Sequence, residues 1–469
     1  MSEPLFQDFP KISAKEWKQK IQSDLKGADY NETLIYKSND GIDVKPFYHQ
    51  DLLEKSVISE NPAHWNICEK IYVASEKPSL EKIKEVLSRG AESLWLVIDS
   101  ENIDLVSILE EIVSNNLEKN IPIFVEFNFL SEKYLSKINS FLSDKKHQVS
   151  FGIDIVGNLA RSGNWYKNLQ SDHEILEKLF TENTTSSLLS VDVSLYQNAG
   201  ANIPQQIAYA ISHANEYFNH FLHRNVTPSA VKGSFSITFK NAIGSNYFFE
   251  IAKLKALRLV FAAVASEYDF SKEMKILAFP TKRNKTLYDF NVNMLRTTTE
   301  CMAAVLGGAD SVCNAAYDEI YHKENEFGTR IARNQLLILK NESYFDPKTS
   351  GENPAEGSYY LETLTNQFAE KALEIFKDIE KSGGFLTQLK NGTIQRKIKE
   401  SAEKEQADFD NGNYILVGTN KYEHAEDRMK SDLELYPFLK QKPRKTLIQP
   451  VLGRRLAEEV EKKRLEKEA

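Results

Sequence analysis

The sequence has little cysteine and no long apolar run, and these absences exclude several classes of protein. Three cysteines, Cys68, Cys301 and Cys313, are too few and too scattered for a disulfide framework or a cysteine-based metal site. We therefore expect a reducing, cytoplasmic environment. No window approaches the roughly 18 uninterrupted apolar residues of a membrane-spanning helix, and the first residues lack the basic and apolar segments of a secretion signal. A net charge of -8 offers no broad basic field, so we expect no binding to nucleic acid.

The chain has the composition of a folded protein with alternating strands and helices. Its 469 residues exceed the usual size of one hydrophobic core, unless the fold is an α/β barrel. Short β-branched and aromatic runs alternate with charged helical patterns from about residue 70. The expected strands are Ile71 to Ala74, Leu94 to Asp99, Ile123 to Phe127, Val149 to Ile155, Leu188 to Val193, Ser234 to Phe239, Met274 to Phe279 and Ser311 to Asn314. About eight such units predict a TIM (β/α)8 barrel, although periodicity alone also allows an open doubly wound sheet.

Four acidic residues follow or end expected strands, where barrel enzymes place catalytic groups. They are Asp99, Glu126, Asp154 and Asp192. Carboxylates at this position could bind a divalent metal or act as acid and base. The simpler interpretation, which we favour, is that they cap loops and helix N-termini, because no known metal spacing joins them.

Two other patterns are weaker candidates for chemistry. His213, Glu216, His220 and His223 share one face of an expected helix, which we expect to meet solvent or another subunit because barrel helices lie outside the strands. Their spacing matches no metal motif, so we expect no metal there. Cys313 ends an expected strand, but a buried thiol is the more common outcome than a nucleophile.

Several segments together resemble the methylmalonyl-CoA mutase family. The longest matching stretches are Arg296 to Glu319 and Gly328 to Leu339. Shorter matches follow the family's order at Trp17, Lys26 to Asp29, Gly41 to Pro46, Ala199 to Ala201, Glu250 to Lys253, Gly357 to Tyr359 and Val417 to Tyr422. The resemblance covers most of the chain and favours a closed barrel over an open sheet.

The same resemblance implies that this chain has lost the family's catalytic groups. Catalytic members read Tyr-His-Met-Gln-Glu-Ala-Gly-Ala after the fifth strand, where this chain has Ser194 to Ala201, with Leu195 in place of the histidine. The loop after the second strand and the last-loop motif, here Asn353 to Tyr359, are also altered. No Asp-x-His-x-x-Gly cobalt-ligand motif occurs, and the segment after Tyr422 is short and charged. We therefore expect that this chain binds no adenosylcobalamin and has no catalytic residues of its own.

The resemblance implies the role of a non-catalytic small subunit. Its partner would be a large catalytic subunit that binds adenosylcobalamin and, in a heterodimer, interconverts (R)-methylmalonyl-CoA and succinyl-CoA, a reaction of propionate metabolism. Two alternatives are a self-sufficient acyl-CoA mutase barrel with a separate cobalamin-binding chain, and an independent metal-dependent barrel enzyme. Leu195 argues against the first alternative, and the absence of metal spacing argues against the second.

We expect three segments along the chain. An N-terminal arm spans residues 1–60, a barrel 61–345 and a C-terminal helical extension 346–469, whose charged end we expect to be a solvated or partner-facing helix. The arm carries the candidate partner contacts Trp17, Phe47 and Tyr48, because aromatic residues are enriched at interfaces. We also expect bulky side chains to fill the barrel axis, and the candidates are Phe127, Phe151, Phe235 and Phe279.

Overall fold

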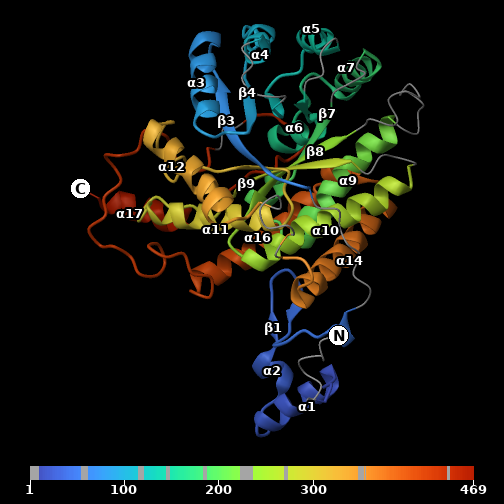
Figure 1. The fold of residues 1–469 in the computed structure, drawn as a ribbon, viewed down its shortest axis with the longest axis vertical. Coiled ribbons are helices and arrows are strands. Elements are labelled where there is room, and N and C mark those ends of the chain that lie inside the picture. The colour runs from blue at the N-terminus through green and yellow to red at the C-terminus, as the bar shows by residue number, and fades with distance from the viewer. Residues whose placement is uncertain are drawn as a thin grey trace, which may run out of the picture.

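A closed barrel of eight parallel strands forms the centre of the computed structural model (Figure 1). The structure describes residues 10–468 except 54–61, 115–120, 144–147, 183–186, 222–235, 269–272, 347–352, 354 and 441–443. The barrel strands, in spatial order β10-β3-β4-β5-β6-β7-β8-β9, are β3 (Asn66–Val73), β4 (Ser93–Ile98), β5 (Ile123–Phe127), β6 (Val149–Ile153), β7 (Ser187–Asp192), β8 (Ile237–Ile243), β9 (Met274–Pro280) and β10 (Ser311–Cys313). Because β10 pairs with both β3 and β9, the sheet is closed and the predicted TIM barrel is confirmed.

Helices follow the strands and cover the outside of the barrel. They are α3 (Glu76–Ser88), α4 (Leu105–Ser114), α5 (Glu132–Ser143), α6 (Ile155–Ser162), α7 (Leu169–Glu182), α8 (Ser194–Asn198), α9 (Ile203–Phe221), α10 (Tyr247–Ser266), α11 (Val292–Leu306), α12 (Glu326–Leu337) and the π-helical turn η2 (Ile338–Glu342). Side chains cap several of them; for example, Asp154 accepts from the Gly157 amide at α6, and Asn325 from the Gly328 amide at α12. No helix among the described residues is long and apolar enough to cross a membrane.

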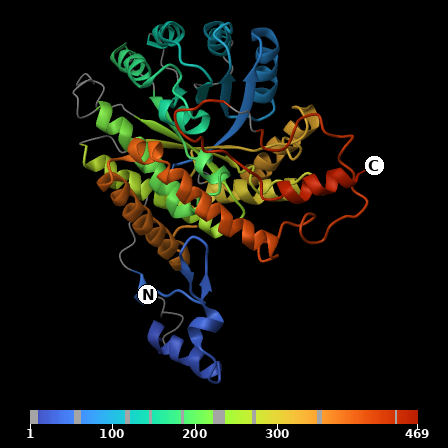
Figure 2. The same ribbon diagram turned by 180° about the vertical axis from the view of Figure 1, so that it is seen from behind.

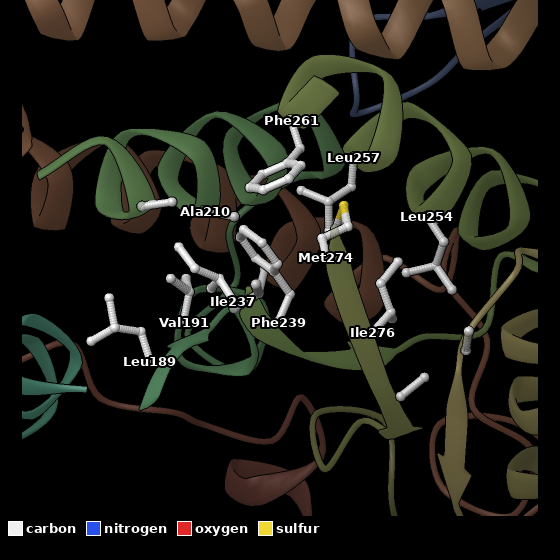
Figure 3. Packing of buried hydrophobic residues seen from close by; sticks show 14 of the residues in the cluster. Leu189, Val191, Ala210, Ile237, Phe239, Leu254, Leu257, Phe261, Met274 and Ile276 are labelled. Carbon is white, nitrogen blue, oxygen red and sulfur yellow. The ribbon is translucent and has the colours of Figure 1, made fainter. Parts of the chain in front are cut away.

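Strand side chains alternate between the helices and the barrel axis. Figure 3 shows the outward set on β7, β8 and β9, where Ile237, Phe239 and Met274 pack towards Leu257 and Phe261 of α10. Thr238 and Lys240 of β8 therefore point towards the axis.

The expectation for the axis phenylalanines is wrong for two of the four. Phe127 and Phe151 belong to the outward cluster, with their ring centroids 5.7 Å apart. Phe279 does face the axis, and Phe235 lies outside the described residues. Strand parity decides this placement, and parity could not be assigned from the sequence.

The N-terminal arm consists of a projecting part and a docked part. It contains α1 (Ala14–Asp24), α2 (Tyr30–Leu34), the hairpin strands β1 (Tyr36–Lys37) and β2 (Asp43–Val44), and a short 3-10 turn, η1 (Gln50–Leu52). Helices α1 and α2 extend away from the barrel (Figures 1 and 2). The hairpin is anchored: the Ile203 amide donates to Asp40 Oδ1 over 2.7 Å, and Ile42 is buried in the main core.

The C-terminal segment wraps the barrel. It comprises α14 (Tyr359–Lys381), α15 (Phe385–Lys390), α16 (Thr393–Asp410) and α17 (Glu458–Lys467), with a long irregular stretch before α17. Helix α14 lies along α9 and α10, and the end of the chain runs back over the barrel (Figure 2). The expected solvated tail is wrong in part, because Glu458 and Glu461 of α17 are buried. Glu461 accepts from the Leu287 amide and pairs with Arg455 over 2.6 Å.

Candidate functional site

The barrel axis holds a buried network of paired charges. Lys240 Nζ lies 2.7 Å from Glu126 Oε1 and 3.1 Å from Asp192 Oδ2. Asp192 Oδ2 also accepts from Arg161 Nη2 of α6 over 2.8 Å. Because β5 and β8 are not neighbouring strands, the contact between Lys240 and Glu126 crosses the inside of the barrel.

The charges in this network stabilise one another's ionised forms. Burial raises the pKa of Glu126, but the charge and hydrogen bond of Lys240 and the charge of Lys70 together lower it by more, so the pKa lies below its ordinary value. Burial also raises the pKa of Asp192, but Lys240 and Arg161 lower it by more, so this pKa too lies below its ordinary value. Burial lowers the pKa of Lys240, whereas Asp192 and Glu126 raise it by more. Two carboxylates and two cations thus form a neutral group.

Aromatic side chains fill the axis beside the network. The Trp95 indole donates to Glu126 Oε2 over 2.9 Å, and its ring lies 5.2 Å from that of Phe279. Lys70 Nζ sits 4.1 Å from the Trp95 ring centroid. Since β4 and β9 are not neighbouring strands, the pair of Trp95 and Phe279 is a second bridge through the inside of the barrel. We conclude that the axis is a packed core at this level.

The remaining two candidate carboxylates have structural partners. Asp154 caps α6 and also accepts from Tyr217 and contacts His213 Nε2, each over 2.8 Å. Burial raises the pKa of Asp154, but His213 and these hydrogen bonds lower it by more. Asp99 accepts from the Asn128 amide group, away from the network. The capping interpretation is therefore correct for Asp154, whereas Glu126 and Asp192 meet through Lys240.

The helical histidine array is split among different partners. His213 is buried, with Asp154 on one side and Tyr196 on the other, whereas we had expected its face to meet solvent or another subunit. His220 contacts Glu177, and Glu216 accepts from the Leu386 amide. His223 lies outside the described residues. Among the residues that the structure describes, no three His, Cys, Asp or Glu side chains are grouped to hold a metal.

Leu195 lies on α8, directly after the fifth barrel strand. Its side chain is half-buried against the main core, whereas the neighbouring Tyr196 is fully buried. A leucine side chain can neither donate a hydrogen bond nor transfer a proton. The position therefore contributes packing at the mouth of the barrel.

The C-terminal segment covers part of that mouth. The Val451 amide donates to the Ala160 carbonyl, the Arg454 amide to Asn198 and the Leu456 amide to Arg283, all over 2.8 to 2.9 Å. These acceptors follow β6, β7 and β9, so the segment lies over the strand ends where barrel enzymes bind substrate.

The long Arg296 to Glu319 segment acts as scaffold. Glu300 on α11 is buried and accepts from Lys285 Nζ over 2.7 Å and from Asn284 over 2.6 Å. Arg296 donates to Asn293 and to the Val417 carbonyl. These bonds hold the loop after β9 against the helix and the C-terminal segment. Farther along, Ser358 of the altered last-loop motif caps α14.

The three candidate partner contacts differ in accessibility. Trp17 on α1 keeps 46% of its surface exposed. Tyr48 instead packs on Tyr360 of α14 in the same chain, with ring centroids 4.9 Å apart and ring planes tilted by 47°, and Phe47 is half-buried. Trp17 is thus the one of the three that lies on the projecting part of the arm.

Fold and site together define a TIM barrel with a filled axis and a partly covered mouth. The sequence model described as methylmalonyl-CoA mutase matches residues 135–466. The methylmalonyl-CoA mutase small subunit of Porphyromonas gingivalis is 30% identical over 449 residues, covering 90% of this chain and 71% of that protein. This chain belongs to the methylmalonyl-CoA mutase family.

Two further relatives show how much of this chain is similar to small subunits and how much to a large subunit. The methylmalonyl-CoA mutase small subunit of Streptomyces virginiae is 25% identical over 419 residues, or 83% of this chain and 67% of that protein. The large subunit of Porphyromonas gingivalis is 32% identical over 251 residues, which cover 52% of this chain and 34% of the large subunit. The similarity to small subunits therefore extends over more of this chain than the similarity to the large subunit.

Proposed function

We propose that this chain is the non-catalytic small subunit of a heterodimeric, adenosylcobalamin-dependent methylmalonyl-CoA mutase. In this proposal the large subunit binds the cofactor and interconverts (R)-methylmalonyl-CoA and succinyl-CoA. The similarity to two small subunits supports this assignment, as does the presence of both a small and a large subunit in Porphyromonas gingivalis.

The observation that carries the proposal is the filled axis behind Leu195. An acyl-CoA arm threaded along the barrel would need the space that Trp95, Phe279 and the Glu126–Lys240 pair occupy. Displacing the ion pair would leave buried, unpaired charges, which costs several kcal/mol per ion. In addition, Leu195 occupies the position of the family's histidine, and leucine cannot donate a proton there.

The same network disfavours a metal-dependent barrel enzyme. A divalent cation at Glu126 and Asp192 would have to replace Lys240, which pairs with both carboxylates and, together with Arg161, neutralises them. A hard cation also needs several oxygen ligands, and Asp154 is committed to α6, His213 and Tyr217.

The test compares equivalent positions in the two subunits of a reconstituted complex. We expect a one-to-one complex with the large subunit from the same organism, and we expect Leu195→Ala in this chain to leave turnover within about twofold, because the side chain only packs. The matched variant replaces the large subunit's histidine at the aligned position with alanine and should abolish turnover. Loss of turnover in Leu195→Ala with the complex intact, or failure of the two chains to associate, would contradict the proposal.

A further inference from the structure

Two of the three cysteines are direct neighbours, although they lie far apart in the sequence. Cys68 on β3 and Cys313 on β10 are in register on adjacent parallel strands. Neighbouring strands are about 4.7 to 4.9 Å apart, which lies inside the roughly 4.4 to 6.8 Å range of Cα separations in disulfides. Both side chains belong to the axis cluster that contains Trp95 and Leu277, so they point to the same side of the sheet.

Both cysteines also line a cavity at the C-terminal ends of β3, β9 and β10. Its volume is about 350 Å³, and other lining residues include Lys70, Lys282 and Glu319. A water molecule needs only about 10 to 15 Å³ of such space, so a small peroxide fits. All three thiols are buried, but Cys301, on α11, is not part of this lining, which makes it an internal reference.

We propose that Cys68 and Cys313 form a redox-active pair, which hydroperoxides oxidise to a disulfide and small thiols reduce. In the first step, the Cys68 sulfur attacks a peroxide oxygen. The O–O bond breaks, Cys68 becomes a sulfenic acid, and the leaving oxygen takes up the thiol proton and departs as water when the oxidant is hydrogen peroxide. In the second step, the Cys313 sulfur attacks the Cys68 sulfur, and the hydroxyl leaves with the Cys313 proton as a second water. The peroxide gains the two electrons that the sulfurs lose.

Both thiols line the same cavity, and we assign the first attack to Cys68. The hydrogen bond to Cys68 and burial raise the pKa of the Cys313 thiol, which suits Cys313 to the second step. The resulting bond joins the first and last strands of the barrel, and thereby locks the closure of the sheet covalently.

The pair is tested on the full-length chain by differential alkylation. The reduced protein is treated with hydrogen peroxide, denatured, alkylated with N-ethylmaleimide and weighed by mass spectrometry. We expect a loss of about 2 Da, from two hydrogens, with one maleimide adduct in place of three. The peptide map should link the Cys68 and Cys313 peptides, and dithiothreitol should restore three adducts.

Variants separate this pair from unspecific oxidation. Cys301→Ser should retain the linked peptide, whereas Cys68→Ser and Cys313→Ser should lose it. If either of the last two variants fails to fold, the peptide map of the unaltered chain still decides. Three adducts after peroxide treatment, a link through Cys301, a link between two chains, or over-oxidised Cys68 beside free Cys313 would each overturn the proposal.

Discussion

Lys240 on β8 joins its ammonium to the carboxylate of Glu126 on β5 over 2.7 Å, across the inside of the barrel. Three strand steps separate the two residues, so the pair spans the space that an open barrel axis would leave free. Together with the contact between Trp95 and Phe279, it gives the barrel two internal bridges. Both bridges occupy space that a substrate arm would need along the axis, and this supports the proposed non-catalytic role.

Replacing Lys240 by methionine should strongly destabilise the fold. The variant removes one ammonium from two buried carboxylates, and breaking a buried ion pair by removing one partner costs about 3 to 5 kcal/mol. Urea denaturation should show this loss, whereas Lys77→Met, at an exposed position on α3, should change stability by less than about 0.5 kcal/mol. The Glu126→Gln and Lys240→Met double variant should lose clearly less than the sum of the two single variants. Strict additivity would show that the pair contributes no coupling energy.

The isolated chain should not bind CoA. Trp95 and Phe279 line the cavity of about 350 Å³ beside Cys68 and Cys313, and with the charge network they bridge the axis next to it, so we expect no continuous path for the pantetheine arm. Calorimetric titration should therefore give no dissociation constant below about 1 mM. The proposed large-subunit partner, titrated in parallel, is the positive control. Micromolar binding to this chain alone would contradict the filled axis and would favour a self-sufficient barrel.

The barrel could be predicted from the sequence because its outward strand faces are apolar. The expected strand Ile123 to Phe127 coincides with β5, and the expected strand Leu94 to Asp99 differs from β4 by one residue at each end. Strand limits fail where charges enter the axis. Strand β8 continues to Ile243. The expected end at Phe239 is too early because Lys240 and Asn241 interrupt the apolar pattern on which the expectation rests. Strand β3 begins at Asn66 instead of Ile71 for the same reason, since Glu69 and Lys70 lie within it.

The site could be predicted only in part. Position at strand ends identified Glu126 and Asp192, but their cationic partners were missed because Lys240 lay beyond the expected strand and Arg161 lies on α6. One sequence feature could have indicated the cationic partner. Lys240 lies two residues after Thr238 and therefore on the same face of the strand. The pairing of Cys68 with Cys313 depends on the closure between the first and last strands, which no local pattern contains.

Substituting Trp17 should weaken association with the large subunit. Trp17 is exposed on the projecting part of the arm, and tryptophan is enriched among residues that dominate binding energy. We expect Trp17→Ala to raise the dissociation constant of the heterodimer at least about tenfold, or 1.4 kcal/mol. Tyr422→Ala, at a residue that is 72% exposed on the C-terminal segment, is the matched control. Equal affinities of both variants and the unaltered chain would place the interface elsewhere.

Tyr48→Ala should act differently from Trp17→Ala. The Tyr48 ring packs on Tyr360 in the same chain, and an aromatic pair of this kind contributes about 0.5 to 1.5 kcal/mol beyond the burial of its area. The variant should therefore lower the thermal midpoint of the isolated chain. A variant that weakens association without changing this midpoint would show that Tyr48 faces the partner.

Asp40 should make the anchoring of the arm depend on pH. Burial, and then the nearby carboxylates Glu250 and Glu405, raise the pKa of Asp40 from its ordinary value of 3.8 to about 6. The folded chain then binds this proton more tightly than the unfolded chain, so the contribution of Asp40 to stability is present at pH 4 and is lost as the pH rises through 6. Asp40→Asn keeps an oxygen for the Ile203 amide but removes the charge. We expect it to stabilise the chain by about 1 to 2 kcal/mol at pH 7.5, because one pKa unit corresponds to 1.36 kcal/mol and partial exposure screens the effect.

Urea midpoints at pH 4.5, 6.0 and 7.5 measure this dependence. The gain of Asp40→Asn over the unaltered chain should shrink as the pH falls, because Asp40 then becomes protonated and resembles asparagine in charge. Asp43→Asn, at an exposed position in the same hairpin, should follow the unaltered chain at every pH. A gain that is constant with pH would assign the effect to hydrogen bonding instead of charge. A loss of stability at pH 7.5 would show that Asp40 is held there in its ionised form, with a cation nearer to it than Glu250 and Glu405.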